Sequence, residues 1–170
     1  MENEINMMPR IGDAAPEFVA ETTQGKIHFR DMDDIDVRFP LIDDVSMKVS
    51  KLYGMIQPGE SKTKAVRAVF FIDPQGVIRT IIYYPLALGR NFDEIKRVLV
   101  GLQTIDEFKV ALPADWRPGG EVIDPNPGNM KGVAERWEKA QEAGSRMKCY
   151  DWFFCTKVIS QEEIEKKIKK

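Results

Sequence analysis

Histidine and cysteine are scarce in this chain of 170 residues: His28 is the sole histidine, and Cys149 and Cys155 are the sole cysteines. A structural zinc site needs about four cysteine or histidine ligands, so these residues cannot complete one. Two cysteines are also too few for a disulfide scaffold. In a reducing compartment such residues are more often redox-active or inert than structural. The sequence therefore predicts neither a metal nor a cofactor.

Long apolar runs and an excess of either charge are also lacking. The longest apolar run, Val66–Ile72, is far shorter than the roughly 18 residues of a membrane helix and contains Arg67. The formal net charge is −2, and no basic stripe marks a nucleic-acid partner. Because Met1–Ile5 is polar and acidic, unlike a secretory leader, we expect a cytoplasmic protein without membrane or nucleic-acid partners.

Hydrophobic residues make up 43% of the chain, enough for a sizeable core. Two β-rich runs, Val66–Ile72 and Val77–Tyr84, flank the turn sequence Asp73–Gly76 and predict a hairpin. The first run is apolar on both faces, which is typical of a strand covered on both sides.

Capping residues and apolar spacing predict a helix after Asp43 or Asp44 that ends near Gly54. Its apolar face would consist of Val45, Val49, Leu52 and Tyr53. A second helix follows the capping pair Asn91 and Glu94. Its core face would consist of Phe92, Ile95, Leu99 and Leu102.

Prolines and glycines from Ala111 onward predict an extended connector, and an amphipathic helix follows it. That helix would bury one face made of Val133, Trp137, Ala140 and Met147. Ser160 and Glu163 read as a capping box for a last, lysine-rich helix. Near the other end of the chain, residues 10–29 predict a small hairpin and residues 30–38 an acidic loop.

Two arginines are candidates for chemistry. Arg67 lies inside an otherwise apolar strand, where a buried guanidinium is costly unless a negative group meets it. Two interpretations of Arg67 are open. It belongs to a site that binds a negatively charged group, or it lies at the edge of the sheet and pairs with an acidic neighbour. Arg90 precedes the second predicted helix, where either a site or ordinary solvent-facing capping fits.

Recognisable segments run through most of the chain. They are Pro9–Phe18, Thr23–Phe29, Asp36–Asp43, Lys51–Met55, Arg67–Arg79, Tyr84–Glu94, Ala114–Gly119 and Cys149–Cys155. In this order they resemble the peroxiredoxin family, in particular its one-cysteine-like, archaeal-type branch. The resemblance implies an α/β, thioredoxin-like sandwich over residues 1–103 and a C-terminal extension over residues 104–170. In that family such an extension is a dimerisation arm.

One segment of the family pattern is missing. Between Phe29 and Arg30 the family carries a central strand and a helix with the motif Pro-x-x-x-Thr-x-x-Cys, which supplies the peroxidatic cysteine. Nothing like it occurs here. We therefore expect an incomplete thioredoxin-like fold in which the peroxidatic cysteine is absent.

The resemblance also implies roles for single residues. Arg67 and Arg90 match family arginines at or near the active site, where a cation lowers a thiol pKa and polarises the peroxide O–O bond. Cys149 and Cys155 have three open interpretations: resolving thiols, small apolar groups packed beside the aromatic residues between them, or an intrachain bridge. His28 corresponds to a histidine that one class of relatives uses with a nearby serine. Because that serine falls in the missing segment, a half-buried strand histidine is the better interpretation.

Three functional hypotheses follow. The chain is a thiol peroxidase that reduces hydrogen peroxide and alkyl hydroperoxides with a thioredoxin-like reductant, impaired by the missing motif. Alternatively it is a non-catalytic subunit that joins peroxiredoxin dimers or rings, or an internally deleted product without a function. Trp116, Trp137 and Trp152 cluster in the last third and favour burial against a partner, as in a homodimer or a higher ring.

Overall fold

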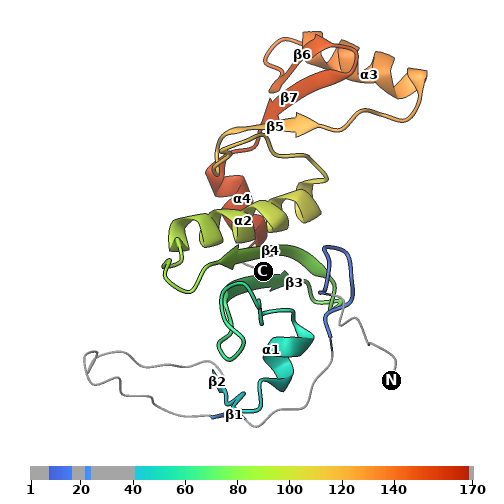
Figure 1. Cartoon of the computed structure of the whole chain (residues 1–170). Helices are drawn as coiled ribbons and strands as arrows, with labels where there is room; N and C mark the ends of the chain where they lie inside the picture. The colour runs from blue at the N-terminus through green and yellow to red at the C-terminus, as the bar shows by residue number, and fades with distance from the viewer. Residues whose placement is uncertain (1–7, 17–21, 24–40, 169–170) are drawn as a thin grey trace. The chain divides into compact units, whose positions relative to one another are not determined.

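The computed structural model describes residues 8–16, 22–23 and 41–168, and it contains two compact units, residues 1–90 and residues 91–170 (Figure 1). The elements of the first unit are β1 (Thr22–Thr23), β2 (Leu41–Ile42), α1 (Lys48–Leu52), β3 (Arg67–Ile72) and β4 (Ile78–Tyr84). Those of the second are α2 (Phe92–Phe108), β5 (Glu121–Asp124), α3 (Met130–Gln141), β6 (Met147–Asp151), β7 (Phe154–Val158) and α4 (Gln161–Ile168).

The central hairpin of the first unit is confirmed. β3 and β4 pair antiparallel from Arg67 opposite Tyr84 to Ile72 opposite Ile78. The Asp73 carboxylate closes the turn by accepting from the backbone N–H of Val77, and Gly76 takes the left-handed φ of 79° that the turn requires. A polar side chain and a glycine thus set the register of the two strands.

Coverage of β3 differs from the prediction. The sheet that contains it has two strands, and along β3 only Phe71 is buried, whereas Arg67 and Ile72 are exposed. An all-apolar strand is typical of the interior of a larger sheet. The prediction of two covered faces was therefore wrong for this chain, because it relied on neighbouring strands that the described residues do not supply.

The first helix is shorter than predicted. α1 begins only at Lys48, so Val45 precedes it and is 84% exposed, contrary to its predicted place on the apolar face. Asp44 does serve this helix, because its carboxylate accepts from the N–H of Val49 and of Ser50. Desolvation opposes the charged form of Asp44, but these backbone hydrogen bonds outweigh it and lower its pKa. Gly54, at φ 64°, follows the helix as predicted.

Part of the predicted N-terminal structure lies outside the described residues. This applies to His28, to the acidic loop over residues 30–38, and to most of the hairpin over residues 10–29. Within the described residues, Ala14 forms an antiparallel bridge with Val77, and β1 pairs with β2.

The second unit is a three-stranded antiparallel sheet of order β5-β7-β6 with three helices. The connector prediction missed β5, and Met147 lies in β6, not on the helix to which it was assigned. The buried core of this unit consists of Val110, Trp116, Val122, Ile159 and Ile164. Short strands in a segment rich in prolines and turns leave little period-two signal, which explains why the sheet was missed.

The Ser160–Glu163 capping box predicted in this unit is confirmed, and of the predicted pair Asn91 and Glu94 the Asn91 cap is confirmed, whereas the Glu94 carboxylate binds Arg97. The Asn91 side chain accepts from the N–H of Asp93 and of Glu94 at the start of α2. Ser160 and Glu163 form the reciprocal capping box at the start of α4, at 3.2 and 3.3 Å. Both signals depend on local geometry alone, which a sequence specifies directly.

The core face of α2 was wrongly predicted. Phe92 is 76% exposed and Leu99 is 48% exposed, whereas Gly101 and Thr104 are buried. Val100 and Phe108 pack against the core of the second unit. The helix carries two apolar stripes, and the periodicity that reveals a stripe does not say which one the core selects.

We expect Ile164→Ala to lower the free energy of unfolding of this unit by about 2–5 kcal/mol, because Ile164 is 1% exposed in its core. Leu99→Ala, on the rejected stripe, should cost less than about 1 kcal/mol. Urea titrations followed by tryptophan fluorescence measure both, since all three tryptophans lie in this unit. Equal losses for the two variants would contradict the assignment of the core.

Candidate functional site

The two candidate arginines lie in the first unit, and neither is buried. Arg67 is exposed at the start of β3, so the expectation of a buried cation was wrong there. Its Nε donates to the carbonyl of Leu86 at 2.9 Å, while the N–H of Leu86 donates to Glu60 at 3.2 Å. Arg90 is exposed and lies in the same loop as Leu86, between β4 and α2. Arg67 therefore holds the loop that carries Arg90.

The two cysteines form a disulfide. Cys149 of β6 lies opposite Cys155 of β7, with the Cα atoms 4.0 Å apart, so of the three open interpretations the structure shows the bridge. Cys155 is fully buried, whereas Cys149 is partly exposed. The pair thus combines one fully buried residue with one that is partly exposed.

A carboxylate belongs to the same row of the sheet. Asp124 of β5 is in register with Cys155, which is in register with Cys149. Directly opposed residues of antiparallel strands share a face, so the three side chains lie side by side across the sheet. Lys157, two residues along β7 on that face, donates to Asp124 at 2.6 Å.

Among the described residues of the second unit, Arg136 of α3 is the buried cation, at 6% exposure. Its guanidinium donates to the carbonyls of Asp124 and Pro125 and to the Asn126 side chain, at 3.1–3.3 Å. It also donates to the carbonyl of Trp152, in the turn between the two cysteines. One guanidinium therefore joins the end of β5 to the disulfide turn.

Charge around this cluster is nearly balanced. Besides the salt bridge to Lys157, Asp124 lies 3.9 Å from Nη1 of Arg136. Two cations thus share the Asp124 carboxylate, and a second carboxylate, that of Asp151, lies in the cysteine turn, where it accepts from the N–H of Trp152.

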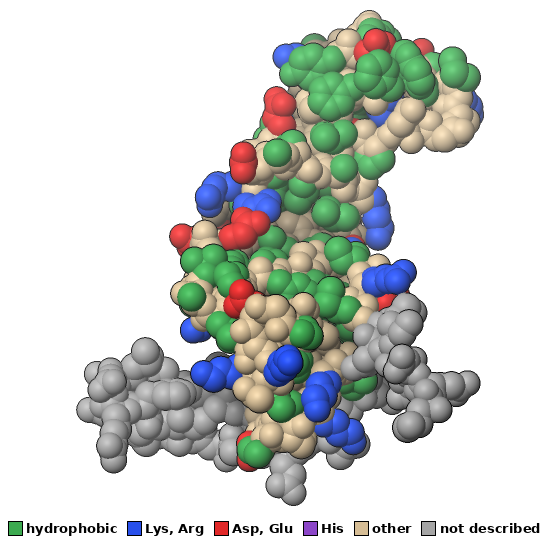
Figure 2. Space-filling view, in the orientation of Figure 1, with side chains coloured by type: hydrophobic (Ala, Val, Ile, Leu, Met, Phe, Trp, Pro, Cys, Tyr) green, Lys and Arg blue, Asp and Glu red, His purple; other side chains and the backbone are tan. Residues whose placement is uncertain are grey.

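The tip of the β6–β7 hairpin and the neighbouring α3 carry large exposed apolar side chains. Tyr150, Trp152 and Phe153 are each more than half exposed. Hydrophobic side chains gather at this end of the unit in Figure 2. Exposed apolar patches of this kind are typical of surfaces that bind another molecule.

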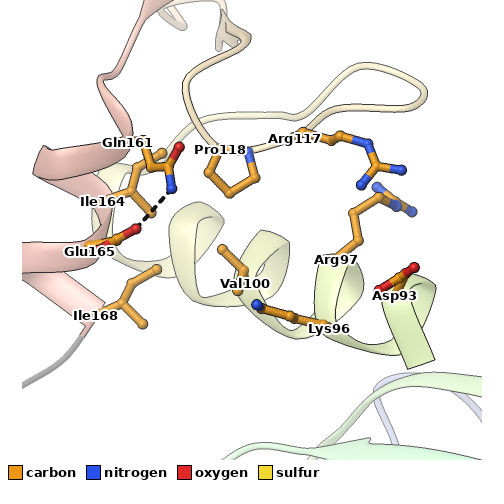
Figure 3. A pocket seen from close by; sticks show the side chains of 10 residues that line it. All are labelled: Asp93, Lys96, Arg97, Val100, Arg117, Pro118, Gln161, Ile164, Glu165 and Ile168. Atoms are coloured by element: carbon orange, nitrogen blue, oxygen red, sulfur yellow. Dashed lines mark hydrogen bonds between the residues drawn. The ribbon is translucent and has the colours of Figure 1, made fainter.

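A cavity of about 630 Å³ lies between α2, α4 and the loop before β5 (Figure 3). Its floor is aliphatic, with Val100 and Ile164, and the guanidinium groups of Arg97 and Arg117 face each other at one end. Arg97 is already bound to Glu94, and its hydrogen bond lowers the pKa of that carboxyl. No cysteine is among the residues that line this cavity.

Sequence reasoning missed Asp124, Arg136 and Lys157. For Arg136 a signal existed: Val133, Trp137 and Ala140 make an apolar stripe in which an arginine occupies the intervening position. The argument that a buried cation needs acceptors was sound, but it was applied to Arg67 and holds for Arg136. Asp124 and Lys157 meet only through the β5–β7 register, which no short-range pattern reveals.

Two properties bear on other kinds of site. Within the part of the chain that the structure describes, no group of three or more histidine, cysteine, aspartate or glutamate side chains is arranged to hold a metal ion. None of the helices in that part is both long and apolar enough to cross a bilayer.

Comparison with known proteins decides the family. The AhpC/TSA family pattern matches residues 27–81, and that of the C-terminal domain of 1-Cys peroxiredoxin matches residues 101–139. A peroxiredoxin of Methanosarcina mazei is 51% identical over 137 residues, 81% of this chain and 61% of that protein. One of Archaeoglobus fulgidus is 47% identical over 130 residues, 74% of this chain and 59% of that protein.

The chain belongs to the peroxiredoxin family. It spans between 55% and 61% of the length of three curated peroxiredoxins that it matches, among them the two named above. Two solved structures resemble it at a TM-score of 0.60 and 28% identity, a yeast mitochondrial 1-Cys peroxiredoxin and a mutant of peroxiredoxin 6 of Arenicola marina. They cover 76% and 74% of this chain, which covers 61% and 58% of theirs.

These peroxiredoxin neighbours confirm the predicted fold class. The chain is α/β, with small sheets that correspond to an incomplete thioredoxin-like fold. The predicted domain boundary between residues 103 and 104 lies inside α2, and the compact units divide before that helix. The assignment of residues 104–170 as a dimerisation arm stays a prediction.

Reduction of the disulfide should lower the free energy of unfolding of the second unit by about 2 kcal/mol. The bridge closes a short loop, with a sequence separation of 6, and restricts the unfolded chain accordingly. Urea unfolding with and without reductant measures the difference, and the double variant Cys149→Ser/Cys155→Ser should match the reduced protein. Equal midpoints in the two redox states would show that the bridge adds no stability.

Proposed function

We propose that this chain serves peroxide reduction as a peroxiredoxin-family protein, and that the isolated chain is impaired as a peroxidase. The substrates would be hydrogen peroxide and alkyl hydroperoxides, and the electrons would come from a thioredoxin-like dithiol. Family membership supports the substrate class. A solved relative, the yeast mitochondrial 1-Cys peroxiredoxin, is described as resolving its thiol through glutathione and thioredoxin systems, which supports the class of reductant.

The impairment follows from the chemistry of the first step. A thiolate must attack one peroxide oxygen, so that the O–O bond breaks, a sulfenate forms and water or an alcohol leaves. Another thiol, called the resolving thiol, then attacks the sulfur of the protonated sulfenic acid, giving a disulfide and water. The two cysteines of this chain are joined to each other, so the oxidised chain has no thiolate for the first step, and neither cysteine lies in the motif that supplies the peroxidatic thiolate in the family. This disulfide is the observation that carries the proposal.

Arg67 and Arg90 retain the roles that the family resemblance implies, as positive groups toward a peroxide and a thiolate. Arg67 keeps one edge of its guanidinium on the Leu86 carbonyl and is exposed, so its other nitrogens are available to a partner. Within this proposal the missing thiolate would have to come from a full-length relative. Cys149 and Cys155 would then act as resolving thiols.

A second candidate is an assembly subunit without catalysis. The exposed aromatic side chains of the β6–β7 hairpin favour it, because burying them against another chain would remove a large apolar area from water. The partner would be a second copy of the chain or a full-length peroxiredoxin, in a dimer or a higher ring.

The fully reduced chain should react with hydrogen peroxide no faster than free thiols do, since only a small percentage of an ordinary thiol is thiolate near pH 7. Stopped-flow mixing of the reduced protein with a small excess of peroxide measures the rate, with Cys149→Ser and Cys155→Ser to assign it. Arg67→Ala should leave the rate within about twofold. A cysteine that reacts orders of magnitude faster, and slows in Arg67→Ala, would show a rebuilt peroxidatic site.

For the assembly candidate, Trp152→Ala/Phe153→Ala should weaken self-association or binding to a full-length peroxiredoxin by at least about tenfold. Both residues are exposed at 55% and 56%, so the variant should fold normally. Sedimentation velocity over a range of concentrations measures the effect, with Leu88→Ala as a control in the first unit, where Leu88 is 54% exposed. Identical distributions for all three proteins would exclude this surface as the interface.

A further inference from the structure

We propose that Cys149 and Cys155 form a thiol–disulfide exchange couple of fixed polarity, in which an external thiol attacks the sulfur of Cys149 and Cys155 is the leaving group. The proposal deepens the proposed function and rests on one part of it, that the pair alternates between disulfide and dithiol. It names the sulfur through which electrons enter.

Accessibility gives the first argument. A thiolate must approach the sulfur that it attacks along the extension of the S–S bond, so that sulfur must be reachable from solvent. Cys155 lies on β7, the central strand of the sheet, and has no exposed surface. Cys149 lies on β6, an edge strand, and is partly exposed. Attack is therefore directed to Cys149.

Electrostatics gives the second argument. The released Cys155 sulfur carries a negative charge, and a buried thiolate needs nearby cations. Asp124 lies next to Cys155 in the sheet, but both Lys157 and Arg136 pair with it. These two cations offset the charge of Asp124, so this carboxylate opposes the leaving Cys155 thiolate less than an unpaired carboxylate would.

The Arg136 guanidinium keeps this polarity when the bridge is open. It donates to the Trp152 carbonyl in the turn and to the Asp124 and Pro125 carbonyls after β5. None of these hydrogen bonds involves a sulfur atom, so breaking the S–S bond leaves them intact. Arg136 is thus a positioning residue that holds the turn while Cys155 remains buried.

The reaction balances as two exchanges with a dithiol reductant. Its first thiolate attacks Cys149, the Cys149–Cys155 bond breaks, a mixed disulfide forms on Cys149, and the Cys155 thiolate takes a proton from water. The second thiol of the reductant attacks its own sulfur in the mixed disulfide and releases the Cys149 thiolate. The dithiol is oxidised to its disulfide, and the protein disulfide is reduced to two thiols.

Single-cysteine variants of the full chain test the polarity. Cys155→Ser leaves only Cys149, and Cys149→Ser leaves only Cys155; each is mixed with 5,5′-dithiobis(2-nitrobenzoate), and thionitrobenzoate release is followed. We expect Cys149 to react at least about tenfold faster in buffer and the two rates to converge in concentrated guanidinium. Equal rates in buffer, or a faster Cys155, would overturn the proposal. Because no peroxide is used, its failure is distinct from failure of the proposed function.

The role of Arg136 is tested by combining each single-cysteine variant with Arg136→Met. The ratio of the two rates should fall below about threefold, while Lys131→Met, an exposed position on the same helix, should leave it unchanged. If the Arg136→Met protein lacks the circular dichroism of the folded chain, Arg136→Lys replaces it, since lysine keeps the charge but cannot span several carbonyls. An unchanged ratio in a folded Arg136 variant would contradict the positioning role.

Discussion

The organisation of the C-terminal unit depends on one buried guanidinium. Arg136 is almost fully removed from water, so each of its donors needs an acceptor, and desolvation would otherwise oppose folding by several kcal/mol. The acceptors come from the end of β5 and from the turn between β6 and β7. Meeting this single requirement therefore fixes where α3 lies relative to β5 and to the cysteine turn.

The N-terminal unit shows the opposite situation, a strand without its neighbours. β3 has the composition of an interior strand, yet it pairs only with β4 in a two-stranded sheet. In a complete thioredoxin-like sheet its apolar side chains would be covered on both faces. Arg67, at the start of that strand, is consequently exposed, and the thiolate that the family resemblance places beside it is not supplied by this chain's cysteine pair. The two cysteines thus lie in a different part of the sequence from Arg67 and Arg90, the arginines that match those of the family.

Local signals in the sequence predicted local structure well. The Asp73 turn, the Asn91 cap and the Ser160–Glu163 box depend on side chains within a few residues of one another, and all three are confirmed. Signals that require a partner were less informative: α2 has two apolar stripes, and only tertiary packing selects the one with Val100 and Phe108 over the one with Leu99. The row of Asp124 and the two cysteines was beyond sequence reasoning, because strand register across β5, β7 and β6 creates it.

The central claim is that Arg136, not the disulfide, holds the cysteine turn. Nuclear magnetic resonance of the Arg136 guanidinium protons, recorded for the oxidised and the fully reduced chain, measures this directly. If the claim is right, these protons exchange slowly with water in both redox states, because their acceptors are carbonyls and a side-chain amide that reduction does not alter. Rapid exchange in the reduced chain alone would show that the disulfide holds the turn and that Arg136 merely follows it.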